Sequence, residues 1–480
     1  MSLQSLAKQT LIYGASTIIL RMASWMLTPY YSYAITQQAN GQVAFFMSIV
    51  AFLNIIYMFG METSYFRFIK SENQNQVFQK TESIVFFNSI LWSLLLVLFA
   101  KPLIAWLGYS DKEIYVYLLT LTLFFENLCN IPFAQLRQEN KALKFVSFKA
   151  LYIILNISLN LILLSYFYKN KIVLPVLNIH DPIELIFWAN LIPWFLVFLY
   201  FSPQIFSSLS WSALKDGKEM LNYSWPLLLV GAAGMVNEVI DRPLLRNLLP
   251  GTQIENEIQL GIYNINYKLA IIMTLAIQAF RMGAEPYFFK LAHEKSSTKM
   301  YAIVMDFFVI VCSMILVITS LNRDIIAMIN NSTYKEGIQI LPILLLANLF
   351  LGMYYNTSIW YKATNNTMKG AYISLVGAVI TIALNWILIP KMGYMGSAWT
   401  TLICYFAMLV ISLIWGRKYY PIPYHYAYNF LWIGLSTVYS LGAYFLFQEN
   451  MWALIGLSFV YLFIACYYAY KRFGDIRGFL

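Results

Sequence analysis

Residues 261–290 read GIYNINYKLAIIMTLAIQAFRMGAEPYFFK, a mostly apolar run that is long enough to cross a membrane as a helix. The run also carries Lys268, Arg281 and Glu285. A charge at the bilayer centre costs about 2.5–3.5 kcal/mol on insertion scales, so each needs a partner, a polar cavity or a nearby interface. An earlier run, residues 41–70, follows the same plan and ends in GMETSYFRFIK. This likeness predicts a chain of two related halves around a polar interior.

The whole chain has the composition of a multi-pass membrane protein. Of its 480 residues, 60% are hydrophobic and 11% are charged, against about 25% charged residues in soluble domains. The basic residues are spread over short loops without a dense patch, so the net charge of +10 predicts no nucleic-acid partner. The four cysteines lie in apolar runs without metal-ligand spacing, and we expect no metal site, disulfide or cofactor.

Fourteen apolar segments are predicted to span the membrane, and their connections are too short to hold a soluble domain. Basic residues favour one side by roughly two to one, which predicts that both termini are cytoplasmic. Arg242 and Arg246 are assigned to the outer side. The predicted spans are residues 10–35, 42–68, 82–107, 114–137, 144–168, 183–203, 220–248, 259–284, 299–321, 338–362, 369–390, 394–416, 426–447 and 451–471.

A weak internal repeat supports two lobes. Sliding the chain on itself aligns Lys144 with Lys369 and Asn160 with Asn385, in spans of the same predicted orientation. We therefore expect an all-α membrane protein built from parallel repeats, with the two asparagines bonding helix to helix. The predicted parts are a six-helix lobe at 1–205, a second six-helix lobe at 206–420, and two appended helices with a cytoplasmic tail at 421–480.

Three cations within the spans are candidates to bind an anionic substrate: Arg21, Lys268 and Arg281. Arg21 lies about 16 Å into the first span, too deep to reach the interface easily, and a structural ion pair with Glu126 is the alternative. Arg281 can instead pair with Glu285, four residues further on. Lys268 and Arg281 point in different directions on a straight helix, so both can face one narrow cavity only if the helix bends or the cavity wraps around it.

Four acidic residues are candidates for coupling or gating: Glu126, Glu238, Asp241 and Glu285. Glu238 and Arg242 stand four residues apart, so an ion pair at the outer end of the seventh span is the competing interpretation. Lys149 and Asp306 lie near the inner ends of their spans, where we expect their side chains to reach the interface.

Several segments resemble the polysaccharide flippases of the multidrug/oligosaccharidyl-lipid/polysaccharide exporter superfamily. They cover most of the chain in the family's order: KQTLIYGASTIILRMASW (8–25), GMETSYFRF (60–68), NEVIDRPLLRNLLP (237–250), QAFRMGAEPYFF (278–289), LPILLLANLFLGMYYNTSIWYKATNNT (341–367) and ALNWILIPKMGYMGSAWTTL (383–402).

The resemblance implies a function for the chain. Such proteins move an isoprenoid-diphosphate-linked oligosaccharide across the cytoplasmic (inner) membrane by alternating access, for cell-surface polysaccharide or lipopolysaccharide biosynthesis. The implied partners are this oligosaccharide, membrane lipid, a polysaccharide polymerase and glycosyltransferases. Arg21 and Arg281 fall in the helices that carry cavity arginines in the peptidoglycan-precursor flippases of the superfamily.

Four other functions stay open. A drug/cation antiporter of the same superfamily needs acidic residues for its cationic substrates, whereas basic and acidic residues are mixed here. A flippase for the lipid-linked peptidoglycan precursor would differ only in cargo. A membrane polysaccharide polymerase or glycosyltransferase would need a large catalytic loop, and none is visible, so we expect no enzyme. Charges within spans fit poorly with a passive scaffold.

Overall fold

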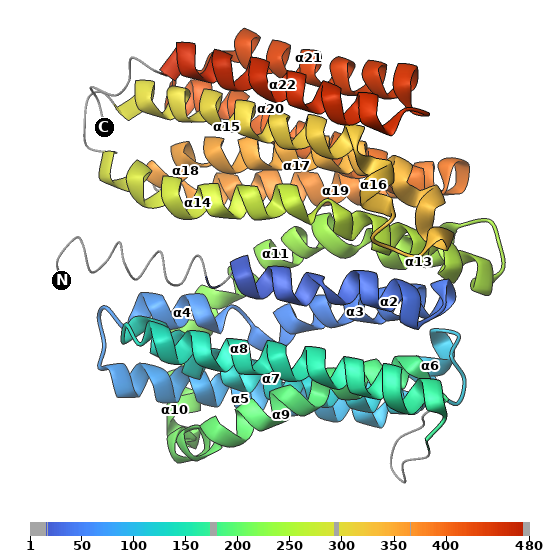
Figure 1. Cartoon of the computed structure of the whole chain (residues 1–480). Coiled ribbons are helices and arrows are strands. Elements are labelled where there is room, and N and C mark those ends of the chain that lie inside the picture. Colours follow the sequence, from blue (N-terminus) through green and yellow to red (C-terminus); the bar gives the residue numbers. More distant parts are fainter. Residues whose placement is uncertain (1–15, 17, 173–179, 292–296, 365, 474–480) are drawn as a thin grey trace. The chain divides into compact units, whose positions relative to one another are not determined.

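The structure is a computed structural model of the chain. It describes the backbone of residues 16, 18–172, 180–291, 297–364 and 366–473, and the side chains of these residues except 283–291, 297 and 363. Every regular element in this described part is a helix (Figure 1). The predicted all-α fold class is confirmed.

Most of the predicted membrane spans are present as helices. The described residues contain 11 helices that are long and apolar enough to cross a membrane, or up to 13 spans if each of two bent pairs is one span. These helices overlap every predicted span from 42–68 onward. The first predicted span, 10–35, falls largely on residues outside the described part, where only 16 and 18–35 can be compared with it.

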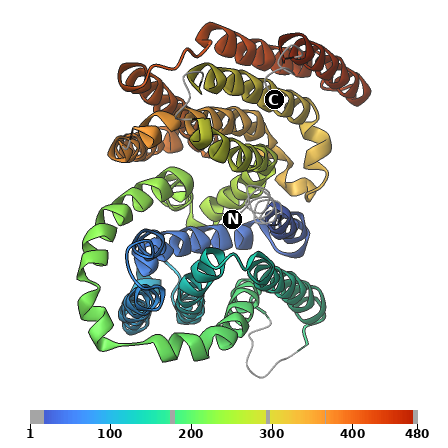
Figure 2. The same ribbon diagram turned by 90° about the vertical axis from the view of Figure 1, so that its left-hand side faces the viewer.

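The first compact unit comprises the chain up to Leu27 together with Ala34–Val239. Residues 18–25 are helical, and a π-helical segment, Ile162–Tyr168, extends α8. Figure 2 shows many of the helices of this unit nearly end-on. Its helices are α3 Gln37–Met58, α4 Met61–Phe68, α5 Gln74–Leu98, α6 Ala100–Trp106, α7 Glu113–Gln138, α8 Ala142–Leu161, α9 Pro182–Ser208, α10 Trp211–Asp216 and α11 Lys218–Val239.

The break between α3 and α4 has a local cause. Phe59 and Gly60 both adopt positive φ, of 48° and 71°, and this left-handed turn ends α3. Gly60 is also close to α11, because a Cβ built on it would lie 3.3 Å from the carbonyl oxygen of Ser224. The Ser64 hydroxyl shares a hydrogen bond with that of Ser224 at 2.5 Å. The helix α4 is therefore held directly against α11.

The start of α9 is fixed by a capping aspartate. The Asp181 carboxylate accepts hydrogen bonds from the amides of Ile183 at 3.0 Å and Glu184 at 3.3 Å, and Pro182 occupies the first helical position. The same carboxylate pairs with the Lys112 ammonium at 2.5 Å. This pair ties the start of α9 to the start of α7.

The core of the first unit is rich in aromatic rings and lies among α4, α5, α7 and α9. Buried rings of Phe133, Phe198 and Phe201 pack there with aliphatic side chains from all four helices. Ring pairs such as Phe133 and Phe201, whose centroids are 5.4 Å apart, meet edge to face. This apolar interior surrounds the charged side chains described below.

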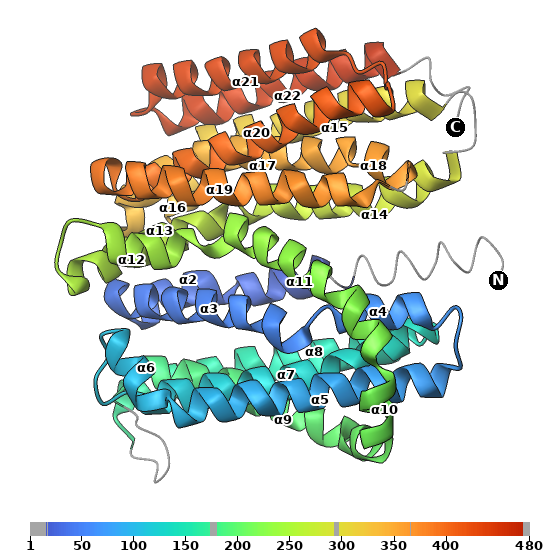
Figure 3. The same ribbon diagram turned by 180° about the vertical axis from the view of Figure 1, so that it is seen from behind.

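The second compact unit comprises Thr28–Tyr33 and the chain from Ile240 onward. In it α17, α19 and α20 lie side by side (Figure 3), and α21 and α22 pack on α15. A 3₁₀ segment, Ser332–Gln339, precedes α17. Its helices are α2 Leu27–Ala34, α12 Asp241–Leu248, α13 Gln253–Leu269, α14 Ile271–Leu291, α15 Ser297–Leu321, α16 Arg323–Ala327, α17 Ile340–Thr357, α18 Ile359–Ala363, α19 Thr367–Met392, α20 Tyr394–Tyr419, α21 Tyr426–Phe447 and α22 Met451–Phe473.

The repeated asparagines have defined hydrogen bonds. Asn385 accepts a bond from the Ser397 hydroxyl at 2.8 Å, which joins α19 to α20. Asn160 donates to the carbonyl oxygen of Asn156 within its own helix at 2.8 Å. Asn156 in turn donates to the carbonyl oxygen of Ala189 on α9 at 3.0 Å. Helix-to-helix bonding is thus confirmed for Asn385, and Asn156 makes a bond of the same kind in the first unit.

Candidate functional site

Two predicted spans are broken into bent pairs of helices. The axes of Lys218–Val239 and Asp241–Leu248 differ by 53°, and those of Gln253–Leu269 and Ile271–Met282 differ by 42°. Irregular backbone at membrane depth is tolerated where it is buried in protein or lines a polar cavity. Both bends are therefore places where a membrane protein can hold polar side chains.

A cluster of polar side chains lies where α12 meets α13, beside the first bend. The Asp241 carboxylate accepts hydrogen bonds from the Arg242 guanidinium at 3.0 Å and from the Tyr263 hydroxyl at 2.5 Å. The Arg242 guanidinium carbon lies 4.7 Å from the centre of the Tyr267 ring. The Lys268 ammonium is within electrostatic range of Arg242. We call Asp241, Arg242, Tyr263, Tyr267 and Lys268 the bend cluster.

An ion pair lies next to the bend cluster. Arg246 pairs with Glu257 at 3.2 Å, and the two residues are only 7% and 1% exposed. Gln253 donates a further bond to Glu257 at 3.1 Å. Arg242 and Arg246 both lie within α12 and are buried, and their assignment to the outer side of the membrane stays a prediction. Their charges are held inside the second unit by nearby carboxylates.

The candidate cations Lys268 and Arg281 lie on opposite sides of the second bend. Lys268 is in α13 and half-buried, whereas Arg281 is in α14, with its guanidinium carbon 4.2 Å from the centre of the Tyr355 ring. The 42° bend between them is the condition under which both could face one cavity. Their joint binding of a substrate stays a prediction.

The other candidates around these bends have mixed outcomes. Asp241 belongs to the bend cluster and is 5% exposed. Glu238 is exposed near the end of α11, and its pairing with Arg242 stays a prediction. The side chain of Glu285 lies outside the described residues, so the alternative pair of Arg281 with Glu285 stays open.

Arg21 and Glu126 both belong to the first unit, but they differ in environment. Arg21 is exposed on the helical segment 18–25. Among the described residues no ion pair joins it to Glu126. Glu126 is half-buried, within hydrogen-bonding range of Asn54 and electrostatic range of Lys149. The structural alternative for Arg21 is therefore not supported, and its predicted role in substrate binding is untested.

Lys149 was not among the predicted site residues, yet it lies within the first unit. Its ammonium is 4.4 Å from the centre of the Phe133 ring and 4.9 Å from that of Trp194. The expectation that Lys149 reaches the interface is wrong, because the side chain turns between α7 and α9. The acidic Glu126 in a neighbouring predicted span was the sequence signal that could have identified this pairing.

Asp306 also departs from its predicted place at the interface. It is fully buried at 0% exposure and accepts hydrogen bonds from Arg472 at 2.7 Å. The His425 ring nitrogen Nδ1 lies 2.8 Å from the same carboxylate oxygen. This three-residue cluster anchors the last two helices, α21 and α22, to α15. Asp306 is thus a structural residue of the second unit.

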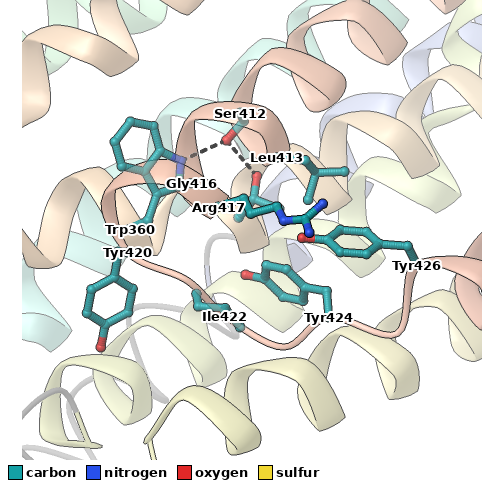
Figure 4. A pocket seen from close by; sticks show the side chains of 10 residues that line it. Trp360, Ser412, Leu413, Gly416, Arg417, Tyr420, Ile422, Tyr424 and Tyr426 are labelled. Atoms are coloured by element: carbon teal, nitrogen blue, oxygen red, sulfur yellow. Dashed lines mark hydrogen bonds between the residues drawn. The ribbon is translucent and has the colours of Figure 1, made fainter.

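A small pocket lies near the C-terminal ends of α17 and α20, against the segment that leads to α21 (Figure 4). Its cavity volume is only about 10 Å³, close to the minimum that holds one water molecule. Trp360 donates to the Ser412 hydroxyl at 3.1 Å at one side, and Arg417 approaches Tyr426 at the other. Burial raises the pKa of the Tyr424 hydroxyl well above its usual value. The pocket is too small for an oligosaccharide.

Comparison with known proteins places the chain among polysaccharide biosynthesis proteins. A family model described as "Polysaccharide biosynthesis protein" matches residues 6–292. The "Lsg locus putative protein 1" of Haemophilus influenzae is 21% identical over 293 residues, which cover 60% of this chain and 67% of that protein. The "Capsular polysaccharide biosynthesis protein CapF" of Staphylococcus aureus is 25% identical over 328 residues, which cover 66% and 78%.

Solved structures of transporters share the fold. The "Lipid II flippase MurJ, inward closed conformation" matches with a TM-score of 0.73 at 14% identity, over 97% of this chain and 99% of that one. An inward-facing "multidrug resistance MATE family transporter of the MOP superfamily" matches with a TM-score of 0.62 at 13% identity, over 85% and 94%. The chain is therefore a multi-pass membrane protein with the transporter fold of this superfamily. Because the family model covers more than half of the sequence, the chain belongs to the polysaccharide biosynthesis protein family.

Proposed function

We propose that this protein is a flippase that moves an isoprenoid-diphosphate-linked oligosaccharide across the cytoplasmic membrane by alternating access. The observation that supports the proposal is the placement of cations in α12, α13 and α14, next to the two helix bends. Lys268 lies close enough to Arg242 for the two like charges to interact, and Arg281 lies beyond the next bend. Like charges that share a membrane-embedded site are stabilised when an anion joins them. A diphosphate group is such an anion.

The cargo itself explains why a protein is needed. Sugars and a diphosphate cannot cross hydrocarbon unaided, whereas an isoprenoid tail is soluble in it. A cavity between two six-helix lobes, 1–205 and 206–420, would take the polar head while the tail stays in the bilayer. Rocking of these lobes would change the side to which the cavity opens. In this proposal residues 421–480 form two appended helices with a cytoplasmic tail, and both termini lie in the cytoplasm.

The family supports the choice of cargo. A capsular polysaccharide biosynthesis protein is among the relatives, and a lipid-linked oligosaccharide is the usual form in which such sugars are assembled on a membrane. A polysaccharide polymerase and glycosyltransferases are the partners that would use and supply this cargo. In the proposed path, Arg21 of the first unit and Arg281 and Lys268 of the second bind the diphosphate.

The experiment that tests the proposal is depletion of the protein in its own cell. Isoprenoid-linked oligosaccharides are profiled by mass spectrometry, together with an assay of which leaflet they occupy. We expect one complete lipid-linked unit to accumulate on the cytoplasmic side. Accumulation of the lipid-linked peptidoglycan precursor would instead identify that precursor as the cargo. An unchanged lipid pool with increased sensitivity to cationic drugs would overturn the proposal in favour of the antiporter.

A further inference from the structure

Glu82 is a fully buried carboxyl group that the proposed substrate path does not use. It lies in the third turn of α5 and is 0% exposed. Among the described residues neither of its carboxyl oxygens has a hydrogen-bond partner. Phe78 and Val85, one turn before and after it on the same face of α5, both belong to the apolar core of the first unit. Glu82 is thus a polar group buried beside the apolar core of this unit.

In the part of the chain that the structure describes, no cation donates a hydrogen bond to the Glu82 carboxyl group. The titratable group that interacts with it is the Cys129 thiol of α7, which is itself fully buried. Cys129 also lies within electrostatic range of Lys149 and Glu126. Tyr65 of α4 packs in the same apolar core, and its hydroxyl also has no hydrogen-bond partner among the described residues.

The neighbouring elements show where Glu82 lies along α5. On the adjacent Ser83, the hydroxyl accepts a hydrogen bond from the amide of Ser210 at the start of α10, at 3.1 Å. A Cβ added at Gly217, just after α10, would lie 2.6 Å from the side chain of Ile84. The short helix α10 therefore packs on α5 at the two residues that follow Glu82. Movement of α10 away from α5 would bring water to this level of the helix.

Charge and hydrogen bonding together limit what Glu82 can do. An ionised carboxylate without a cation or donors is very costly in such surroundings, so the group holds its proton there. A neutral carboxyl without partners still loses hydrogen bonds that it made to water, and it adds nothing that holds α5 to α7. The charged form of Glu82 is unstable in this buried position, and the uncharged form makes no bond that fixes it there. Such a carboxyl group is suited to taking up and releasing a proton when its surroundings change.

We propose that Glu82 is a proton-binding site of the first unit, protonated in the conformation described and deprotonated when water reaches it from the side of α10. The step is the simple transfer of a proton between the carboxyl group and water. Its consequence for transport rests on the proposed flippase function: binding and release of this proton would couple the conformational cycle to a pH gradient.

The first test measures the proton directly and needs no transport. Infrared difference spectra of the full-length protein in lipid compare the wild type with Glu82→Gln across pH values from about 5 to about 9. An ordinary glutamate is less than about 1% protonated at pH 7. We expect a protonated-carboxyl band that is present at pH 7 in the wild type and absent from Glu82→Gln. If Glu82→Gln shows the same protonated-carboxyl bands at pH 7 as the wild type, the proposal is overturned.

A matched control separates Glu82 from the other carboxyl groups. Glu72 lies just before α5, is partly exposed and pairs with Lys80 at 2.8 Å. Glu72→Gln should leave the protonated-carboxyl band at pH 7 unchanged. Glu82→Gln is close in size and neutral, so a thermal melt should show a folded protein. If it does not fold, the same band is measured in Glu82→Asp, where it should persist and shift.

The second test measures coupling in liposomes that carry the lipid-linked oligosaccharide. One proton per cycle allows a pH gradient of one unit to shift the distribution of cargo by up to about tenfold. We expect the wild type and Glu72→Gln to respond to the gradient and Glu82→Gln not to respond. An equal response in all three would overturn the coupling. If the wild type moves no cargo at all, the flippase function fails, and the infrared band alone decides the proton site.

Discussion

In the second unit, buried charges meet opposite charges: Asp241 with Arg242, Arg246 with Glu257, and Asp306 with Arg472. In the first unit, the ammonium of Lys149 lies over two aromatic rings, and Glu82 has no hydrogen-bond partner among the described residues. Removing one partner of a buried ion pair leaves the other charge uncompensated and costs much folding free energy. A buried group without an ion-pair partner can gain or lose its proton without leaving such a charge behind. These three pairs of the second unit thus hold fixed charges, whereas Lys149 and Glu82 of the first unit are placed to change state.

The largest effect that tests this difference is expected from Glu257→Ala. Glu257 is paired with Arg246 at 3.2 Å, and both are nearly inaccessible. Removing the carboxylate leaves a buried guanidinium without this ion-pair partner, which costs about 3–5 kcal/mol of folding free energy. Thermal unfolding of the purified protein in detergent should show this loss as a large fall in Tm.

Two further variants make this prediction specific to the buried pair. Glu72→Ala removes a partly exposed pair with Lys80 and should cost less than about 1 kcal/mol. The double variant Arg246→Met, Glu257→Met replaces both charges by apolar groups and should recover most of the stability. Equal losses for Glu257→Ala and Glu72→Ala would contradict the distinction between buried and exposed pairs.

A smaller loss is expected from Asp306→Asn. The carboxylate is fully buried, but its partners are partly accessible, with 33% exposure for the Arg472 side chain and 47% for that of His425. Both partners can regain water, so we expect a cost of about 2 kcal/mol. Because these bonds anchor the last two helices, hydrogen exchange should rise in α21 and α22 and stay unchanged elsewhere.

Hydrogen exchange is measured by mass spectrometry, with Glu336→Gln as the control. Glu336 is an exposed residue of the same unit. It should leave the exchange of α21 and α22 as in the wild type. A uniform rise across the whole second unit in Asp306→Asn would show that Asp306 stabilises the unit as a whole and does not act as a local anchor.

The proposed substrate cations should affect transport and leave folding intact. Arg281→Ala, Lys268→Ala and Arg21→Ala are each expected to lower oligosaccharide translocation at least tenfold, which corresponds to about 1.4 kcal/mol. The readout is the appearance of lipid-linked oligosaccharide in the outer leaflet of liposomes. Lys299→Ala, an exposed cation of the second unit, serves as the matched control and should transport normally. Full transport by all three variants would remove the cationic path.

The helices were predictable from sequence, whereas charge partners that lie far apart in the chain were not. Each crossing needs about 20 apolar residues whatever lies around it, so hydropathy alone located the spans. The partners of Asp306 are 119 and 166 residues away in the chain, and no local spacing predicts them. Glu82 escaped notice because it is the first residue of the predicted span 82–107, where it resembles an interfacial charge. In the structure α5 begins at Gln74, which places Glu82 in the interior.

The smallest effect tests the first unit, through Lys149→Met. Methionine keeps an apolar stem of similar length but loses the charge that lies 4.4 Å from the Phe133 ring and 4.9 Å from that of Trp194. Such an interaction contributes about 1 kcal/mol, and thermal unfolding should report a loss of this size. Lys144→Met is the matched control on α8, since its ammonium lies 5.1 Å from the Tyr200 ring and the residue is exposed.

A double-mutant cycle then separates the rings from the carboxylate. If Glu126 contributes to holding Lys149, the losses of Lys149→Met and Glu126→Gln will not add, with a coupling of about 0.5–1 kcal/mol. If the rings hold the charge alone, the two losses will add. A Lys149→Met protein that loses no more stability than Lys144→Met would contradict the cation–ring account. The contrast with the buried ion pairs of the second unit would then rest on Glu82.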